Sequence, residues 1–331
     1  MILTILYNIL KILNLVIHVL IAVAFLTYEE RKIISALQRR KGPNKVGFGG
    51  LLQPFADGLK LFTKETILKN AVTNAHLFLL APFSIFVLSL LGWAVIPIGK
   101  YVCTLSNLQL GVLYILAVTG SAIYSIILAG FASNSIYAFL GCLRAAAQVI
   151  SYELAMGFII LTVVISAGSL NPMTIVEKQE KVWYIVPFFP IVYMFYIIIL
   201  AETNRHPFDL VEAESELVSG YNIEYSSMGF AYFFLAEYGS MLLMKSLLVL
   251  LFCGGWLPLF NIMPFNLIPG PVWFSIKVNF FIFLDILMRG VIPRFRYDQL
   301  MQLGWKVFLP FSISFFYLVA TVLIVFNGLP Q

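Results

Sequence analysis

Apolar runs of about 20 residues recur along this chain, and they constrain its fold more than any other feature. A helix of about that length crosses a hydrocarbon core of roughly 30 Å. Only helices and closed barrels satisfy their backbone hydrogen bonds within lipid, and these runs lack the period of two typical of barrel strands. The sequence therefore predicts an all-α polytopic membrane protein, in which residues 1–331 form a single integral membrane domain.

We expect eight membrane-spanning helices, at 3–27, 75–98, 108–131, 145–168, 182–200, 227–251, 272–290 and 304–326. The first run is too long for a cleavable signal and lacks a small-residue cleavage site, so we interpret it as the first span. One side of the membrane then receives connectors with 13 Lys and Arg, at 28–74, 132–144, 201–226 and 291–303, whereas the other side receives three. The positive-inside rule places the basic connectors on the cytoplasmic or matrix face and the N-terminus outside.

The cysteines and histidines give no sign of a redox centre. The chain has three cysteines without a CxxC motif and three widely separated histidines, which do not form a haem or zinc pair at helical spacing. We therefore expect this chain to bind no cofactor or metal itself.

The first connector predicts an amphipathic helix in the membrane surface. Its apolar face would carry Leu51, Leu52, Phe55, Leu59 and Phe62, and a second face would carry Asp57, Lys60 and Lys64. Pro54 suits the first turn of such a helix. The alternative is a membrane-stop signal with an anchoring helix, which leaves Asp57 among the lysines unexplained.

Two acids inside the predicted spans need an explanation, because a charge there costs about 2.5–3.5 kcal/mol on insertion scales. Glu153 and Glu237 have no basic residue one turn away on their own helices. Each therefore needs a partner on another helix, a bound proton, or water.

The other charges near the span ends have simpler interpretations. Asp285 and Arg289 are one turn apart, and we expect an ion pair between them. Lys245 and Lys277 lie toward the outer ends of their helices, and we expect their side chains to reach the headgroups.

The connector 201–226 concentrates acids around a single base, Arg205. Its six acids are Glu202, Asp209, Glu212, Glu214, Glu216 and Glu224. If they are buried together, they cannot all be ionised comfortably, and their titrations are coupled. Interleaved apolar residues distinguish the segment from a solvated acidic loop, which is the alternative. We interpret it as a buried proton-carrying path, with Glu202 able to pair with Arg205.

Three long blocks resemble the family of quinone-site membrane subunits of respiratory complex I, the NADH:ubiquinone oxidoreductase. They are EERKIISALQRRKGPNKVGFGGLLQPFADGLKLFTKE at 29–65, AETNRHPFDLVEAESELVSGYNIEYSS at 201–227 and PRFRYDQLMQLGWKVFLP at 293–310. The QVISYE and FFLAEY segments are similar as well, and the resemblance covers essentially the whole chain.

The resemblance implies a membrane-arm subunit of a proton-pumping enzyme, which is not catalytic alone. Its first helix, surface helix and sixth and seventh helices would frame a tunnel for the tail of ubiquinone, the substrate. FMN and iron–sulfur clusters would belong to partner subunits. The expected partners are peripheral-arm quinone-module subunits, small membrane-arm subunits and lipids, with no nucleic acid. The expected location is the mitochondrial inner membrane, or alternatively a bacterial plasma membrane.

The resemblance also implies roles for individual residues. The matching acids form a proton path, Glu153, Glu202, Glu212, Glu214, Glu224 and Glu237, to which the acidic connector adds Asp209. The matching tunnel residues are Arg31, Arg40, Asp57, Lys60, Phe234, Arg289, Arg294 and Arg296. Three positions depart from the family pattern, Asp285, Leu287 and His206. Asp285 could hold Arg289 away from the tunnel, and His206 could titrate with Glu202 or face water.

Two other functions are compatible with parts of the pattern. An independent cation/proton antiporter would have broken helices in two related halves, and the sequence has no such repeat. The equivalent protein of a related membrane-bound hydrogenase shares the fold and some of the blocks, but the long match at 201–227 favours the quinone enzyme.

Overall fold

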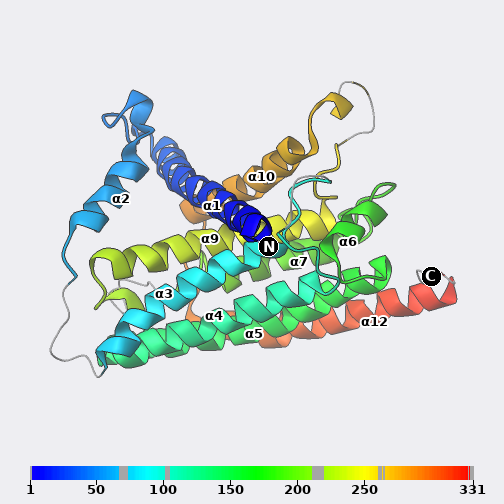
Figure 1. Ribbon diagram of the computed structural model, residues 1–331. Helices are drawn as coiled ribbons and strands as arrows, with labels where there is room; N and C mark the ends of the chain where they lie inside the picture. Colours follow the sequence, from blue (N-terminus) through cyan, green and yellow to red (C-terminus); the bar gives the residue numbers. More distant parts are fainter. Residues whose placement is uncertain are drawn as a thin grey trace.

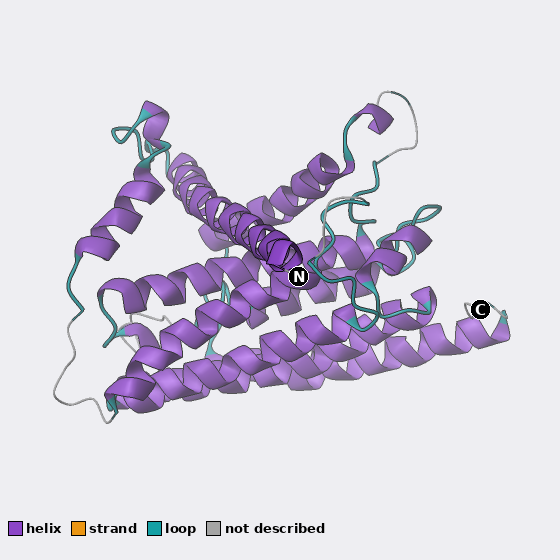
Figure 2. Ribbon diagram, viewed as in Figure 1, coloured by secondary structure: helices purple, strands orange, loops and turns teal. Residues whose placement is uncertain are grey.

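The computed structural model describes residues 2–66, 74–100, 105–210, 220–259, 263, 265–326 and 328. Within these ranges the regular elements are helices (Figure 2). Seven of the helical segments described are long and apolar enough to cross a membrane, and one shorter apolar helix accompanies them. The prediction of an all-α polytopic membrane protein is confirmed.

The long apolar helices are α1 (Ile2–Leu37), α3 (Ala75–Leu91), α4 (Gly111–Ala132), α5 (Ile136–Ala167), α9 (Ser227–Phe252) and α10 (Gly270–Val291). The last segment joins α11 (Tyr297–Gln302), a π-helix (Leu303–Phe308) and α12 (Leu309–Val325). The shorter helices are α2 (Gln53–Thr63), α6 (Pro172–Lys178) and α7 (Phe189–Glu202), and 3-10 turns lie at Phe48–Gly50, Gly92–Val95, Gly220–Asn222 and Phe265–Leu267.

Three predicted boundaries were wrong. The helix α1 continues ten residues beyond 27 to Leu37, since the first glycine or proline after that point is Gly42. The helix α5 begins at Ile136 rather than 145, where the Ser135 side chain accepts a hydrogen bond from the Ala138 backbone N–H. The helix α7 begins at Phe189 rather than 182, with Pro190 in its first turn.

The helix α9 is the most deeply buried of the candidate spans and lies in the centre of the helical assembly. It packs against α1, α2, α3, α7 and α10, whereas α5 packs against α4, α7 and α12. Figure 1 shows α4, α5 and α12 alongside one another, with α1 and α10 extending from the opposite side of α9. Chain segments that are distant in sequence therefore meet around α9.

The predicted surface helix is present as α2, with Pro54 in its first turn. The five residues of its predicted apolar face, Leu51, Leu52, Phe55, Leu59 and Phe62, are exposed. The opposite face is tied to α1, because Arg31 donates a hydrogen bond to Asp57 Oδ2 at 2.5 Å. An apolar face without cover beside helices that span a membrane fits a helix lying in the interface.

The predictions for the two lysines were wrong. Lys245 is fully buried and forms an ion pair with Asp285 Oδ1 at 2.9 Å. Lys277 donates hydrogen bonds to the backbone carbonyls of Cys253, Gly255 and Leu257, at 2.7, 3.0 and 2.7 Å. Partners on neighbouring elements therefore neutralise or solvate these ammonium groups within the protein, and neither needs to reach the headgroups.

Candidate functional site

A cavity of about 520 Å³ opens between α1, α9, α10 and the loop after α1. Its lining combines apolar surface with three arginines, and the residues are Thr27, Glu30, Arg31, Ile34, Arg40, Gly42, Pro43, Phe234, Tyr238 and Arg289. We call it the outer cavity. The structure thus brings together four of the predicted tunnel residues, Arg31, Arg40, Phe234 and Arg289, with a fifth, Asp57, behind Arg31.

Glu30 is the residue at which the elements around the outer cavity meet. Its buried carboxylate accepts a hydrogen bond from the Tyr238 hydroxyl at 2.5 Å and pairs with Arg289 of α10. It also pairs with Arg205, which follows α7, at 3.3 Å. One carboxylate near the end of α1 therefore connects α9, α10 and the segment after α7.

This arrangement corrects two predicted pairs. Arg289 does not take Asp285, one turn away on α10, because Lys245 occupies Asp285 and Glu30 occupies Arg289. Arg205 forms its ion pairs with Glu30 and with Glu237, the latter at 3.1 Å, rather than with Glu202. The rule that pairs residues one turn apart applies to neighbours on one helix, whereas these partners come from other helices.

Arg205 links the outer cavity to the acids deeper in the protein. Its guanidinium lies 4.2 Å from the centre of the Tyr238 ring, in addition to its two ion pairs. Burial alone would lower the pKa of Arg205, but the carboxylate of Glu237 and that of Glu30 raise it well above its usual value. Arg205 is therefore a fixed positive charge between two acids.

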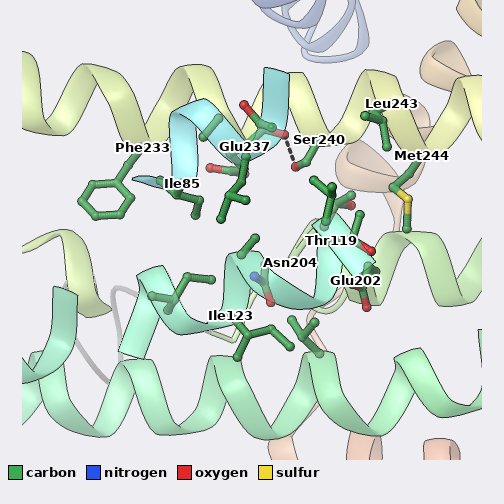
Figure 3. Close-up of a pocket in the computed structure, with 18 of the residues that line it drawn as sticks. Ile85, Thr119, Ile123, Glu202, Asn204, Phe233, Glu237, Ser240, Leu243 and Met244 are labelled. Atoms are coloured by element: carbon green, nitrogen blue, oxygen red, sulfur yellow. Dashed lines mark hydrogen bonds between the residues drawn. The ribbon is translucent and has the colours of Figure 1, made fainter. Parts of the chain in front are cut away.

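A second cavity, of about 80 Å³, lies beyond Glu237 among α3, α4, α5, α9 and the end of α7. Figure 3 shows Glu237 and Ser240 on one wall and Glu202 and Asn204 on the opposite wall, with Phe233 and Met244 toward the two ends. We call it the inner cavity. Its volume accommodates several water molecules. Two proposed proton-path acids, Glu202 and Glu237, therefore face one cavity.

Polar atoms at the inner cavity await a partner that water can provide. Glu202 Oε2 and Asn204 Oδ1 are buried and make no hydrogen bond within the part of the chain that the structure describes. A buried polar atom without a partner costs about 1–3 kcal/mol, so water at these atoms is favoured. The arrangement is suited to proton exchange between Glu202 and Glu237.

Glu153 lies near the middle of α5, close enough to Glu202 for their charges to interact. Gly120 of α4 leaves room for its carboxylate, because a Cβ at position 120 would lie 2.7 Å from Glu153 Oε1. Glu153 also lines an apolar groove with residues that include Leu116, Leu154 and Phe158. Glu153 is thus the third acid of this region.

The remaining predicted residues do not line either cavity. Asp209 pairs with Arg294 at 3.1 Å, and Arg296 pairs with Asp298 at 3.1 Å beside α11. Lys60 is exposed on α2, and Glu224 is half-buried in the turn before α9. Glu212 and Glu214, like Glu216, lie outside the described residues.

The sequence interpretation missed Glu30 and Tyr238. Glu30 was counted as a charge in a loop because the first span was expected to end at 27. The available signal was the run EERKIISAL, which lacks glycine and proline and therefore continues the helix with Glu30 three residues after Thr27. Tyr238 follows Glu237 directly, but its partner lies far away in sequence, on α1.

Within the described ranges, no group of three or more His, Cys, Asp or Glu side chains is arranged to hold a metal ion. The groups that the two cavities offer are carboxylates, arginines, hydroxyls and aromatic rings. These can bind a polar organic headgroup and exchange protons.

Residues 10–320 match the family model described as NADH dehydrogenase. The chain belongs to this NADH dehydrogenase family. Relatives include the NADH-ubiquinone oxidoreductase chain 1 of Chondrus crispus, 54% identical over 320 residues, which are 97% of this chain and 98% of the relative. The same protein of Arabidopsis thaliana is 54% identical, with the same coverage. An NADH-quinone oxidoreductase membrane protein of Rhodospirillum rubrum is 55% identical over 324 residues, 98% of this chain and 96% of the relative.

Proposed function

We propose that this chain is the membrane-arm subunit of a proton-translocating NADH:quinone oxidoreductase, with ubiquinone as its substrate. The observation that carries the proposal is the connection of the outer cavity to the inner cavity through Glu30, Arg205 and Glu237. The names of the relatives support the same enzyme class. The chain supplies no electrons in this proposal, because FMN and iron–sulfur clusters belong to partner subunits.

In this proposal the outer cavity holds part of the quinone. Phe234 supplies an apolar wall for the isoprenoid tail, and the guanidinium groups of Arg31, Arg40 and Arg289 orient the oxygens. Asp57 fixes Arg31 from behind through their 2.5 Å ion pair. The position of α2 beside α1 then determines the width of the entrance.

Coupling in this proposal runs through competition for Arg289. Reduction of a quinone to a quinol consumes two electrons and two protons, and negative charge develops in the cavity before the protons arrive. Arg289 is attracted to that charge, and Glu30 then depends on Arg205 and Tyr238. A stronger Glu30–Arg205 pair weakens the Arg205–Glu237 pair, so Glu237 takes up a proton that Glu202 and Glu153 can pass on.

The proposed partners are the peripheral-arm subunits that form the other wall of the outer cavity and the small membrane-arm subunits beside Glu153. The proposed location is the mitochondrial inner membrane, with the bacterial plasma membrane as the alternative. The basic connectors would face the matrix or cytoplasm and the N-terminus the intermembrane space. The apolar groove at Glu153 gives one partner helix a place to pack.

The decisive test substitutes Glu202→Gln, with Glu212→Gln in parallel. In the assembled complex, quinone-coupled turnover should fall, whereas NADH oxidation by an artificial acceptor should persist. The control is Glu180→Gln, an exposed acid in the segment after α6. Equal loss of both activities means an assembly defect, and unchanged coupled turnover with Glu202→Gln removes Glu202 from the proton path.

The assembly itself is tested on a native gel after mild detergent extraction. The chain should migrate in a very large band that stains for NADH dehydrogenase activity. A small particle containing this chain alone would contradict the proposed membership of the complex.

A further inference from the structure

Lys245 and Asp285 form an ion pair that is sealed inside the protein between α9 and α10. Their side chains are 0% and 3% exposed, and the Lys245 Nζ to Asp285 Oδ1 distance is 2.9 Å. Lys245 Nζ also lies 4.2 Å from the centre of the Tyr196 ring on α7. We call Lys245 and Asp285 the sealed pair. Neither residue lines the outer or the inner cavity.

Asp285 is nevertheless close to the groups that serve the outer cavity. It borders a small cavity together with Glu30, Arg205, His206 and Arg289. Arg289 is also four residues after Asp285 on α10, a spacing that places both side chains on one helix face. The carboxylate of Asp285 is therefore a potential partner for Arg289.

The charges in this neighbourhood are balanced. Three cations, Arg205, Lys245 and Arg289, pair with three acids, Glu30, Glu237 and Asp285. If the charge of Lys245 is lost, Asp285 becomes a buried acid without a cation, which is strongly unfavourable. One of the two arginines then has to compensate for it.

Arg289 is the arginine that can move. Its side chain is 43% exposed, whereas that of Arg205 is 11% exposed and is held by Glu30, Glu237 and the Tyr238 ring. A turn of the Arg289 side chain toward Asp285 removes it from Glu30 and from the outer cavity.

We propose that Lys245 is a positioning residue for quinone binding: by neutralising Asp285 it keeps Arg289 on Glu30 and in the outer cavity. This inference rests on the proposed function, since it assigns Arg289 to the quinone. It gives the sealed pair a purpose beyond packing, because a lysine remote from the substrate determines where a substrate-facing arginine lies.

The test measures quinone reductase activity of the assembled complex in membranes, with a short-chain ubiquinone analogue. Lys245→Met should raise the KM for the analogue about tenfold, because one hydrogen bond to a charged group is worth about that factor. The kcat and the activity with an artificial acceptor should change little. Lys245→Gln removes the charge but keeps a hydrogen-bond donor beside Asp285, so it provides the same measurement if Lys245→Met does not assemble.

The matched control is Asp285→Leu, which also breaks the pair but leaves no acid to attract Arg289. It should reduce the amount of assembled complex while leaving the KM unchanged. The double variant Lys245→Met/Asp285→Leu should return the KM to the wild-type value, since buried ion pairs are often replaced by apolar residues without loss of stability.

Two results overturn the inference. One is an equal rise of KM in Lys245→Met and Asp285→Leu, which indicates a structural role. The other is a double variant that keeps the raised KM of Lys245→Met. Arg289→Met distinguishes this failure from failure of the proposed function: an unchanged KM in Arg289→Met removes the quinone from the outer cavity, whereas a raised KM there with an unchanged KM in Lys245→Met refutes only the role of Lys245.

Discussion

Two groups of charged residues connect α9 to α10, and they differ in their access to cavities. The sealed pair contains one base and one acid, both shielded from the outer and inner cavities. The second group, which we call the cavity cluster, contains Glu30, Arg205, Glu237, Tyr238 and Arg289. Its acids share their bases, and its members line both cavities.

The difference shows that burial of charge does not by itself identify a proton path. A balanced pair in a dry environment has one favoured arrangement, because any proton transfer or separation lacks a recipient. A cluster in which Glu30 contacts two arginines and a tyrosine has several arrangements of similar energy, and the cavities supply water and substrate. Shared partners and cavity access are therefore the features that distinguish coupling residues from structural ones.

The strongest test of this comparison is removal of the acid that the cavity cluster shares. Glu30→Ala leaves Arg205 and Arg289 as buried or half-buried cations with one acid fewer, which costs about 3–5 kcal/mol. We expect quinone reductase activity to fall at least a hundredfold in the complex that assembles. Activity with a short-chain quinone, normalised to the artificial-acceptor rate, measures this loss.

The neighbouring acid provides the control for Glu30. Glu29 is exposed, does not line the outer cavity, and differs from Glu30 only by its direction from α1. Glu29→Ala should retain most of the activity. Comparable losses in the two variants would mean that the charge at the end of α1, rather than its place in the cavity cluster, is what matters.

A smaller effect is expected from Tyr238→Phe, which deletes the hydroxyl that donates to Glu30 at 2.5 Å. A hydrogen bond to a charged group contributes about 1.5–3 kcal/mol, so we expect roughly a tenfold loss of coupled turnover. Tyr232→Phe is the same change on the same helix, at a ring that packs on Phe83 and Phe86, and should be nearly neutral. Equal activities of the two variants would remove Tyr238 from coupling.

An effect of a few-fold is expected when the apolar wall of the outer cavity is made polar. Phe234→Ser removes the ring that faces the cavity and that stacks near Tyr238. Because the lost contact is mainly apolar, inhibitors of the quinone site should bind several-fold more weakly, while the artificial-acceptor activity is retained. Inhibition curves identical to those of the wild type would place the quinone tail elsewhere.

The sequence predicted the helices of this fold better than the partners of its charges. The spans at 227–251 and 272–290 correspond within two residues to α9 and α10, because the length of an apolar run is a local property. The ion pairs of Lys245, Arg205 and Arg289 join residues of different helices, and periodicity within one helix carries no information about such partners. The grouping of Arg31, Arg40, Phe234 and Arg289 was predicted only through the family resemblance.

The smallest expected effect concerns pH and belongs to the edge of the cavity cluster, where His206 lies in the small cavity beside Arg205, Arg289 and Asp285. Burial lowers the pKa of His206, the positive charges of Arg294 and Arg289 lower it further, and Asp209 opposes them. The unfolded chain, with a histidine pKa of about 6.5, therefore binds a proton that the folded site resists. Stability should fall as the pH decreases below about 6.5, until it passes the folded pKa. His206→Gln should lose less thermal stability between pH 7.5 and pH 5.5 than the wild type, measured as the temperature at which quinone reductase activity is lost. The control is His76→Gln, at an exposed position on α3. An identical pH dependence in His206→Gln and the wild type would show that the site accepts the proton without cost, and that the edge of the cavity cluster is as indifferent to pH as the sealed pair.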